Sequence, residues 1–421
     1  MSRPVLGLAL ACAVVVGHAD ADSILIQHAT IHTQTDQGIV ENADLLIRAG
    51  RIVSISIERL APSAADTVVD ARGQTITPGL FSAHSQLGLD EIDLEATTVD
   101  SRLDPDSPGP GPAFDVQYGF NAESVVVEVN LAEGVTHGVI APRVGSDIIA
   151  GLGAFADFGR GQVVTPGIAL FADVGASAAA RVGGSRAAAI GQLRYTLKQL
   201  KTFRPRGYQP NTGEYSRRDM LALKAHLTAR RPLVISAHRA NEITQLIDLA
   251  EDFDLNLIIM GATEAWRVAD RLASNEIPVI IDPLSNIPVS FEHLGARLDH
   301  AALLNQSRVR FAITAPDQHN VRLLRQHAGN AVAHGLPWQQ GLYAITRATA
   351  DIFQLDTSAG TLAEGQTADL VIWSGDPLEV TTWATKVFIA GKALDPTTRQ
   401  TQLYERYKTL KRAPHEYGYQ R

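Results

Sequence analysis

The stretch "AITRATADIFQLDTSAGTLAEGQTADLVIWSGDPL", residues 344–378, contains a sharp change of pattern. It begins as a helix in which Thr346 and Thr349 precede an apolar end. Gly360 and Gly365 predict two turns, because glycine adopts turn conformations at little steric cost. The run "DLVIWSG" that follows has the composition of a strand. The stretch therefore predicts that the chain leaves a helical region here and returns to a sheet.

Residues 23–75 have a similar strand character at the other end of the chain. The runs "SILIQHATIHT", "ADLLIRAGRIVSISI" and "DTVVDARGQTIT" are rich in isoleucine, valine and threonine, and turn signals separate them. A further strand-like run, "TKVFIAGK", follows "DLVIWSG". We predict that both ends join in one composite β-sandwich, formed by residues 22–77 and 366–400, with a C-terminal tail at residues 401–421.

Between these ends, residues 78–365 alternate apolar strand-like runs with helical stretches. The strand-like runs are "VTHGVIAP", "GIALFADVG", "PLVISAHRA", "NLIIMGA", "IPVIIDP" and "VRFAITAP", and residues 241–252 and 263–273 fit helices. Residues 104–113 and the Gly-rich residues 143–161 read as loops. Repeated βα units indicate a parallel sheet, and a closed barrel needs about 250 residues. The predicted fold class is α/β, a (β/α)8 TIM-like barrel beside the composite β-sandwich.

Composition excludes some classes of function. The 421 residues are 45% apolar and 19% charged, with a net charge of −8. This acidic balance argues against a broad nucleic-acid surface, which needs a basic excess. No run after the N-terminus is long and apolar enough to predict a membrane span. We expect a small-molecule substrate, and the sequence does not encode a readable oligomeric state.

The N-terminal stretch "MSRPVLGLALACAVVVGHADADS" has the pattern of a secretory signal. Arg3 precedes an apolar run, and Ala19-Asp20-Ala21 gives the small-residue cleavage pattern. We predict a signal peptide at residues 1–21, cleavage near Ala21, and a periplasmic or secreted protein. A lipoprotein anchored through Cys12 is the alternative. Cleavage would remove the one cysteine, so any metal would have to bind histidine or carboxylate side chains.

Four motifs resemble the amidohydrolase superfamily, in its imidazolonepropionase-like branch. They are "TITPGLFSAH" at residues 75–84, "SAHRANEI" at 236–243, "GATEAWRVAD" at 261–270, and the stretch quoted first. The resemblance covers residues 24–392. The second and third motifs resemble the fifth- and sixth-strand regions of exported members of that branch. It implies a (β/α)8 barrel with a composite β-sandwich and a metal site at the barrel mouth.

The resemblance implies a metal-ligand set, which this chain keeps in part. His84 and His238 match histidine ligands of strands 1 and 5, and Asp317 matches the strand 8 aspartate, which also moves the proton of the attacking water. Gln86 stands where a second strand 1 histidine is expected, and Gly261 stands near an expected strand 6 histidine. No lysine or glutamate ligand of strand 4 is evident. The resemblance therefore implies one divalent metal ion, zinc, held by three residues, rather than two.

Three further residues are candidates for substrate binding. Gln86 lies beside His84 in the first motif, and Arg239 follows His238 and could clamp a carboxylate. His319 lies two residues after Asp317. Each could instead fill a structural role, as an internal ion pair or a packed side chain.

Three hypotheses of function follow. The first is an exported, metal-dependent hydrolase of C–N bonds of the amide or peptide-derived class. The second is a non-catalytic protein that has kept the fold and acts as a binding or assembly partner, which the depleted ligand set favours. The third is metal-free hydrolysis by an Asp/His pair. Metal content per chain discriminates between the first two.

Overall fold

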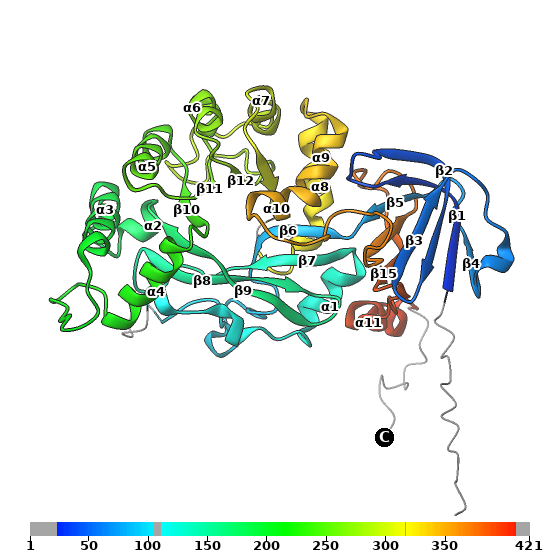
Figure 1. Cartoon of the computed structure of the whole chain (residues 1–421), viewed down its shortest axis with the longest axis horizontal. Helices are drawn as coiled ribbons and strands as arrows, with labels where there is room; N and C mark the ends of the chain where they lie inside the picture. The colour runs from blue at the N-terminus through cyan, green and yellow to red at the C-terminus, as the bar shows by residue number, and fades with distance from the viewer. Residues whose placement is uncertain (1–22, 105–110, 316, 410–421) are drawn as a thin grey trace, which may run out of the picture.

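The computed structural model describes residues 23–104, 111–315 and 317–409. The predicted signal peptide at residues 1–21 lies outside these ranges. Two eight-stranded sheets organise the molecule (Figure 1). One is built from strands near both ends of the chain, and the other from the middle.

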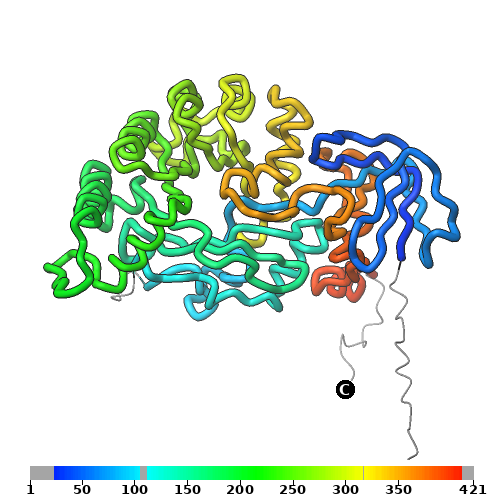
Figure 2. Tube along the Cα trace, viewed as in Figure 1, coloured from blue at the N-terminus to red at the C-terminus, as the bar shows by residue number. Residues whose placement is uncertain are grey.

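The first sheet joins segments that are far apart in the sequence. Its strand order is β16-β15-β14-β5-β1-β2-β3, and β4 pairs with β1. The antiparallel pairing of β5 with β14 sets Ile76 opposite Ile372, and Figure 2 shows the first and last segments side by side. The strands are β1 (Ser23–His32), β2 (Ile39–Arg48), β3 (Arg51–Ser56), β4 (Thr67–Asp70), β5 (Thr75–Pro78), β14 (Leu370–Trp373), β15 (Ala384–Ile389) and β16 (Lys392–Ala393).

One apolar cluster holds the two ends together. Ile26, Leu45 and Ile76 from the N-terminal strands pack with Leu370 and Phe388 from the C-terminal strands, and all five are buried. Burying such side chains stabilises a fold by about 1.5–3 kcal/mol each. The C-terminal strands are therefore an integral part of this sheet.

The second sheet carries the alternating runs of the middle of the chain. Its order is β13-β12-β11-β10-β9-β8-β7-β6. The strands are β6 (Leu80–Ser85), β7 (Val135–Ile140), β8 (Ile149–Asp157), β9 (Gln162–Asp173), β10 (Leu233–Ala237), β11 (Leu257–Gly261), β12 (Val279–Ile281) and β13 (Phe311–Ile313). From β9 to β13 every neighbouring pair is parallel, so the carboxyl ends of these strands share one rim.

The repeated βα pattern is interrupted at β8. Residues 143–161 were expected to form a loop, but Ile149–Asp157 is a strand that pairs antiparallel with both β7 and β9. Its glycines hid this strand from pattern analysis. A side chain at Gly153 would collide with the Phe171 ring and the Ile140 carbonyl, so glycine is required there by close packing.

Eleven α-helices are described, and several stand along the outside of the second sheet (Figure 1). They are α1 (Val125–Ala132), α2 (Ala176–Ala179), α3 (Arg186–Thr202), α4 (Arg217–Thr228), α5 (Ala240–Phe253), α6 (Ala269–Ser274), α7 (His300–Gln306), α8 (Leu324–Ala333), α9 (Trp338–Ala344), α10 (Arg347–Ile352) and α11 (Arg399–Tyr407). Helix α5 matches its prediction, whereas 263–273 splits into a short 3-10 turn and α6. Within the described ranges, none of the helices has the length and apolar character needed to cross a membrane.

The second sheet is nearly closed. No ladder among the described residues pairs β13 with β6, but the Thr314 hydroxyl donates a hydrogen bond to the His84 carbonyl at 2.8 Å. The Thr349 hydroxyl on α10 likewise donates to the Phe81 carbonyl at 3.0 Å. Phe81 and Phe171 belong to an apolar cluster that draws on strands all around the sheet, so the interior is a packed core.

A buried histidine outside the site gives this fold a testable pH dependence. His300, at the start of α7, is 5% exposed and its Nε2 has no hydrogen-bond partner among the described residues. Burial lowers its pKa to about 4. Because the folded pKa lies below the unfolded value, this contribution to stability is complete above pH 6.5 and is lost as pH falls toward 4.

We expect His300→Leu to reduce the acid sensitivity of the protein. Between pH 7 and pH 5 the wild type should lose roughly 2 kcal/mol more unfolding free energy than the variant, by proton linkage to this group. Urea unfolding at both pH values measures the difference. His319→Leu, at an exposed position, is the control. Equal pH dependence in wild type and His300→Leu would contradict the assignment.

Candidate functional site

The rim formed by the carboxyl ends of the parallel strands carries the histidines expected from the sequence. His84 lies at the end of β6, and its ring centroid is 5.9 Å from that of Phe171 in the barrel core. The β6–β7 ladder shifts register between Ser82 and Ser85. Neighbouring side chains of a regular strand point to opposite faces, but a register shift breaks this alternation. His84 therefore points inward, although its neighbour Ala83 also belongs to the interior cluster.

The environment of His84 keeps its imidazole neutral. Burial, with a smaller effect of the Arg143 charge, lowers the pKa of His84 to about 4. Gln86 is also buried, and its amide donates a hydrogen bond to the Ala141 carbonyl at 3.3 Å. The same amide nitrogen lies 3.5 Å from Nε2 of His84. The structure therefore brings His84 and Gln86 together, with Gln86 tied mainly to the end of β7.

His238 follows β10 on the same rim and is also neutral. Burial lowers its pKa to about 4, with a contribution from the neighbouring His293. The two rings have centroids 4.3 Å apart. Nδ1 of His238 lies 2.9 Å from the Thr263 hydroxyl, a contact that fixes the orientation of the ring.

The absence of a side chain at Gly261 makes room for the His238 ring. A Cβ at this position would be 2.5 Å from Cε1 of His238 and 3.0 Å from both ring nitrogens. The backbone of Gly261 also has a φ of +82°, which favours glycine. The ring of His238 therefore occupies the space that a side chain from the end of β11 would need.

Two carboxylates at the mouth were missed by the sequence analysis. Asp173 ends β9 and accepts hydrogen bonds from the Gly175 amide at 2.6 Å and the Ser177 hydroxyl at 2.9 Å. Its pKa is raised by burial and by the charge of Glu292, which outweigh these bonds. The signal was the aspartate at the end of the run "GIALFAD", where an acid at the carboxyl end of a barrel strand indicates a site.

Glu292 connects the mouth to α3 and α5. Arg186 forms ion pairs with Glu292 at 2.7 Å and with Glu242 at 2.9 Å. Burial would raise the pKa of Glu292, but hydrogen bonds from Arg186 and the Ala176 amide lower it. Glu292 and His293 lie in the loop between β12 and α7, which has no readable pattern in the sequence.

The remaining predicted residues are Asp317, His319 and Arg239. Asp317 and His319 are exposed, and Asp317 has a left-handed backbone with a φ of +62°. Its carboxylate receives a 3.5 Å hydrogen bond from the Asn320 side chain. In the described ranges no hydrogen bond, ion pair or ring contact joins Asp317 or His319 to His84 or His238. Arg239, half-buried, begins α5 directly after His238.

The donors at the mouth fit a divalent ion in part. His84 and His238 are neutral, which is the form that binds a metal. Zinc-bound donor atoms lie within about 4 Å of one another, given bonds of about 2.1 Å. Over the residues described, the one group of three whose donor atoms lie within 4.8 Å of one another is His137, Asp157 and Asp369, so no third donor joins the two mouth histidines at that distance.

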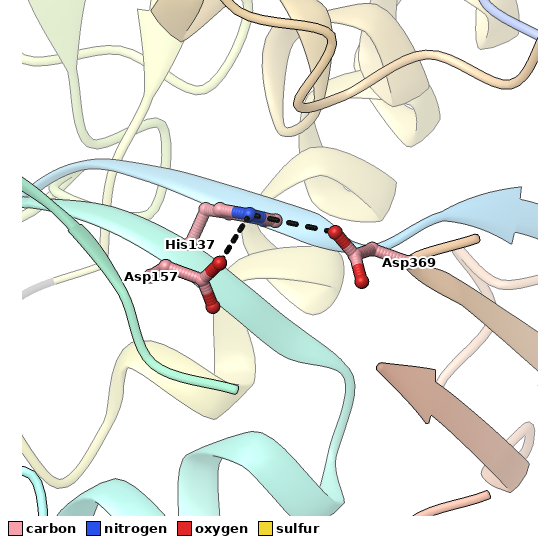
Figure 3. A group of neighbouring side chains, drawn as sticks. All are labelled: His137, Asp157 and Asp369. Atoms are coloured by element: carbon pink, nitrogen blue, oxygen red, sulfur yellow. Dashed lines mark ion pairs between the residues drawn. The ribbon is translucent and has the colours of Figure 1, made fainter. Parts of the chain in front are cut away.

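The three side chains of that compact group point toward one another (Figure 3), and the group is already paired with a cation, Arg160. His137 Nε2 lies 3.6 Å from Asp157 and 3.9 Å from Asp369. Arg160 forms ion pairs with both carboxylates. Burial would raise the pKa of Asp157, but the hydrogen bond from His137 and the nearby positive charges lower it. A metal here would have to displace the Arg160 guanidinium, so we interpret the group as a junction between barrel and first sheet.

Similar proteins were found by both sequence and structure. The family model of the amidohydrolase family matches residues 324–394. The chain is 42% identical over 69 residues to the 5-methylthioadenosine/S-adenosylhomocysteine deaminase of Thermococcus kodakarensis, and 37% identical over 54 residues to the imidazolonepropionase of Salmonella schwarzengrund. These alignments span 16% and 13% of this chain and the same shares of those relatives.

The structural similarity covers far more of the chain. A solved amidohydrolase from Thermotoga maritima MSB8 superposes with a TM-score of 0.75 at 25% identity. The match covers 88% of this chain and 99% of that protein. The short sequence matches and the long structural match point to the same superfamily. The chain belongs to the amidohydrolase superfamily.

Proposed function

We propose that the protein hydrolyses C–N bonds in small molecules at the mouth of the barrel. The observation that carries this proposal is the pair of half-buried histidines, His84 and His238, at the carboxyl ends of β6 and β10, whose lowered pKa values leave both rings neutral. In barrels of this kind, active sites occur at the carboxyl ends of the strands. Membership of the superfamily supports the reaction class.

The chemistry proposed for the chain's own residues is proton transfer. Water adds to the carbonyl carbon of an amide-like bond, the C–N bond breaks, and the nitrogen leaves with a proton. The neutral His238 ring, held at Nδ1 by Thr263, leaves Nε2 available to ligate a divalent ion, and an aspartate at the mouth would take and return that proton. When bound, a divalent ion would supply polarisation of the scissile carbonyl.

We further propose that His84 and His238 hold one divalent ion, zinc, as the sequence predicts. The third ligand and proton acceptor predicted from sequence is Asp317. Asp173 is the alternative from the structure, because it lies two residues after Phe171, on the side of β9 that faces the His84 ring. Gln86 and His319 stay predictions for substrate binding.

The proposal is tested by metal analysis and turnover together. Protein purified without chelators should contain about one zinc per chain and release free amine from a panel of dipeptides and N-acyl amino acids. His238→Ala should lose the metal and slow turnover by about 100-fold or more, because a bound ion would supply several kcal/mol of transition-state charge stabilisation. Comparing Asp173→Asn with Asp317→Asn identifies the third ligand. Metal-free wild-type protein that stays inactive after Zn²⁺ or Mn²⁺ addition would sink the proposal.

A second candidate function is a binding role without catalysis. The observation that favours it is that the His238 ring fills the space beside Gly261, while no histidine, aspartate or glutamate in the described part of the chain forms a compact group of three with the two histidines. This candidate predicts a stable, metal-free protein that hydrolyses none of the panel. Metal-free hydrolysis, the third hypothesis, predicts turnover that is insensitive to EDTA.

Two further interpretations stay predictions. Export to the periplasm or beyond, with cleavage near Ala21, is supported by the N-terminal pattern in the sequence. Division into a (β/α)8 barrel at residues 78–365 and a composite β-sandwich at 22–77 plus 366–400 is supported by the two separate strand networks. Mass spectrometry of the exported chain and limited proteolysis, respectively, test them.

A further inference from the structure

A cavity of about 640 Å³ lies beside the mouth, between the start of α3 and the start of α5. Its lining is rich in hydrogen-bond donors. It includes Ser185, Arg186, Arg194, Arg239, Asn241 and Gln245. Ligand sites of this size bind small molecules through a few placed polar groups.

Two of the three arginines are already paired with carboxylates. Arg186 is shared by Glu242 and Glu292, as described above, and Arg194 forms an ion pair with Asp252 at 2.7 Å. The guanidinium of Arg239 forms no ion pair or hydrogen bond with any described residue. Its backbone amide, in contrast, donates to Glu242 at 3.2 Å. The cavity therefore presents one positive charge that has no partner among the residues that the structure describes.

The backbone beside Arg239 adds donors of the same kind. Gly183 and Gly184 have φ values of +91° and +77° and turn the chain into α3. Ser185 is the N-cap residue of α3, and its side chain makes no capping hydrogen bond. The first amides of a 17-residue helix thus remain available at the edge of the cavity, and a helix N-terminus attracts negative charge.

The wall of the cavity includes a residue next to the proposed reaction centre. Arg239 directly follows His238, and Arg186 contacts Glu242 in the cavity wall and Glu292 at the mouth. In the subsite proposed below, the rest of a molecule held at Arg239 would extend toward His238. A planar guanidinium binds a carboxylate through two parallel hydrogen bonds.

We propose that Arg239 and this cavity form a subsite for a single carboxylate of the substrate, so that the substrates are amides bearing a free carboxylate near the scissile bond. This inference rests on the proposed function, because a substrate subsite presupposes the proposed hydrolysis. One unpaired guanidinium matches one negative charge, and a doubly charged phosphate would leave a charge uncompensated. Arg239 is thus a specificity residue, separate from the residues that move protons.

A binding experiment tests the subsite without turnover. Three probes are used: 4-oxopentanoate, 4-oxopentanamide and inorganic phosphate. The first is the carbon isostere of N-acetylglycinate, and the second is the neutral amide of the first. The binding of each is measured by calorimetric titration at low ionic strength. The wild type should bind 4-oxopentanoate at least about 10-fold more tightly than the amide or phosphate, a difference of one charge-assisted contact. Arg239→Gln should reduce this preference to less than about twofold.

Matched variants make the outcome decisive. Arg194→Gln removes an arginine from the same cavity and should keep the wild-type preference, and Arg239→Lys should retain an intermediate preference. Equal binding of acid and amide by the wild type, equal loss in Arg194→Gln, or tighter binding of phosphate would each overturn the subsite. Binding of 4-oxopentanoate by a protein that hydrolyses no amide would overturn the proposed function and leave the subsite standing. Thermal melting confirms that each variant is folded.

Discussion

Replacing Gly261 by alanine is expected to lower the free energy of unfolding by about 2–5 kcal/mol and to displace the His238 ring, since a left-handed backbone and an overpacked contact each add a cost. The backbone at Gly261 has a φ of +82°. The new methyl group would lie 2.5 Å from the ring of His238. Displacing the ring breaks its contacts with Thr263 and His293, so activity and metal binding should fall with stability.

Gly365→Ala is the matched control for this change. Gly365 has nearly the same φ, +81°, but a Cβ there would meet nothing within 4 Å. It should therefore show the backbone cost alone, about 1–2 kcal/mol. Urea unfolding of both variants, with the histidine resonances followed by NMR, separates the two effects. Equal losses and unshifted His238 signals would show that the ring does not fill this space.

Replacing Trp373 by alanine is expected to cost about 3–5 kcal/mol of unfolding free energy, the usual range for truncating a buried aromatic residue. Trp373 is fully buried at the end of β14. Its indole nitrogen donates a hydrogen bond to the Thr77 hydroxyl at 2.9 Å, and its ring packs closely against Gly134 of the barrel. The change therefore removes contacts that join the first sheet to the barrel.

Trp383→Ala controls for the loss of a tryptophan from the same region. Trp383 is 61% exposed, so its truncation should change stability by about 0.5 kcal/mol or less. Thermal and urea unfolding measure both variants. A Trp373→Ala protein as stable as Trp383→Ala would mean that the junction between sheet and barrel contributes little to the fold.

The sequence predicts the strands of this molecule better than their pairing. The quoted stretch at 344–378 and the N-terminal strands indicate a sheet at both chain ends, and the structure pairs β5 with β14. Strand β8 was missed because Gly151 and Gly153 have the composition of a loop. Glycine is there because neighbouring groups approach closely, which is a long-range property that local patterns do not contain.

The candidate site was predictable where a residue follows a recognisable strand. His84 and His238 end apolar runs inside two motifs, and the structure sets both inward and neutral. Glu292 and His293 reach the mouth from a loop, so only the fold brings them there. For Asp317, residues 314–317, "TAPD", leave the register of the strand end open in sequence, and its exposed position follows from where β13 ends.

The pairing of β5 with β14 also imposes an order of events on a growing chain. Roughly 300 residues separate Ile76 from Ile372, its partner across the ladder. At about 5–20 residues per second, a ribosome needs roughly 15–60 s to make that interval. During this time one edge of β5 and the apolar side chains facing it have no partner, so the unfinished chain is exposed to aggregation until its last strands emerge.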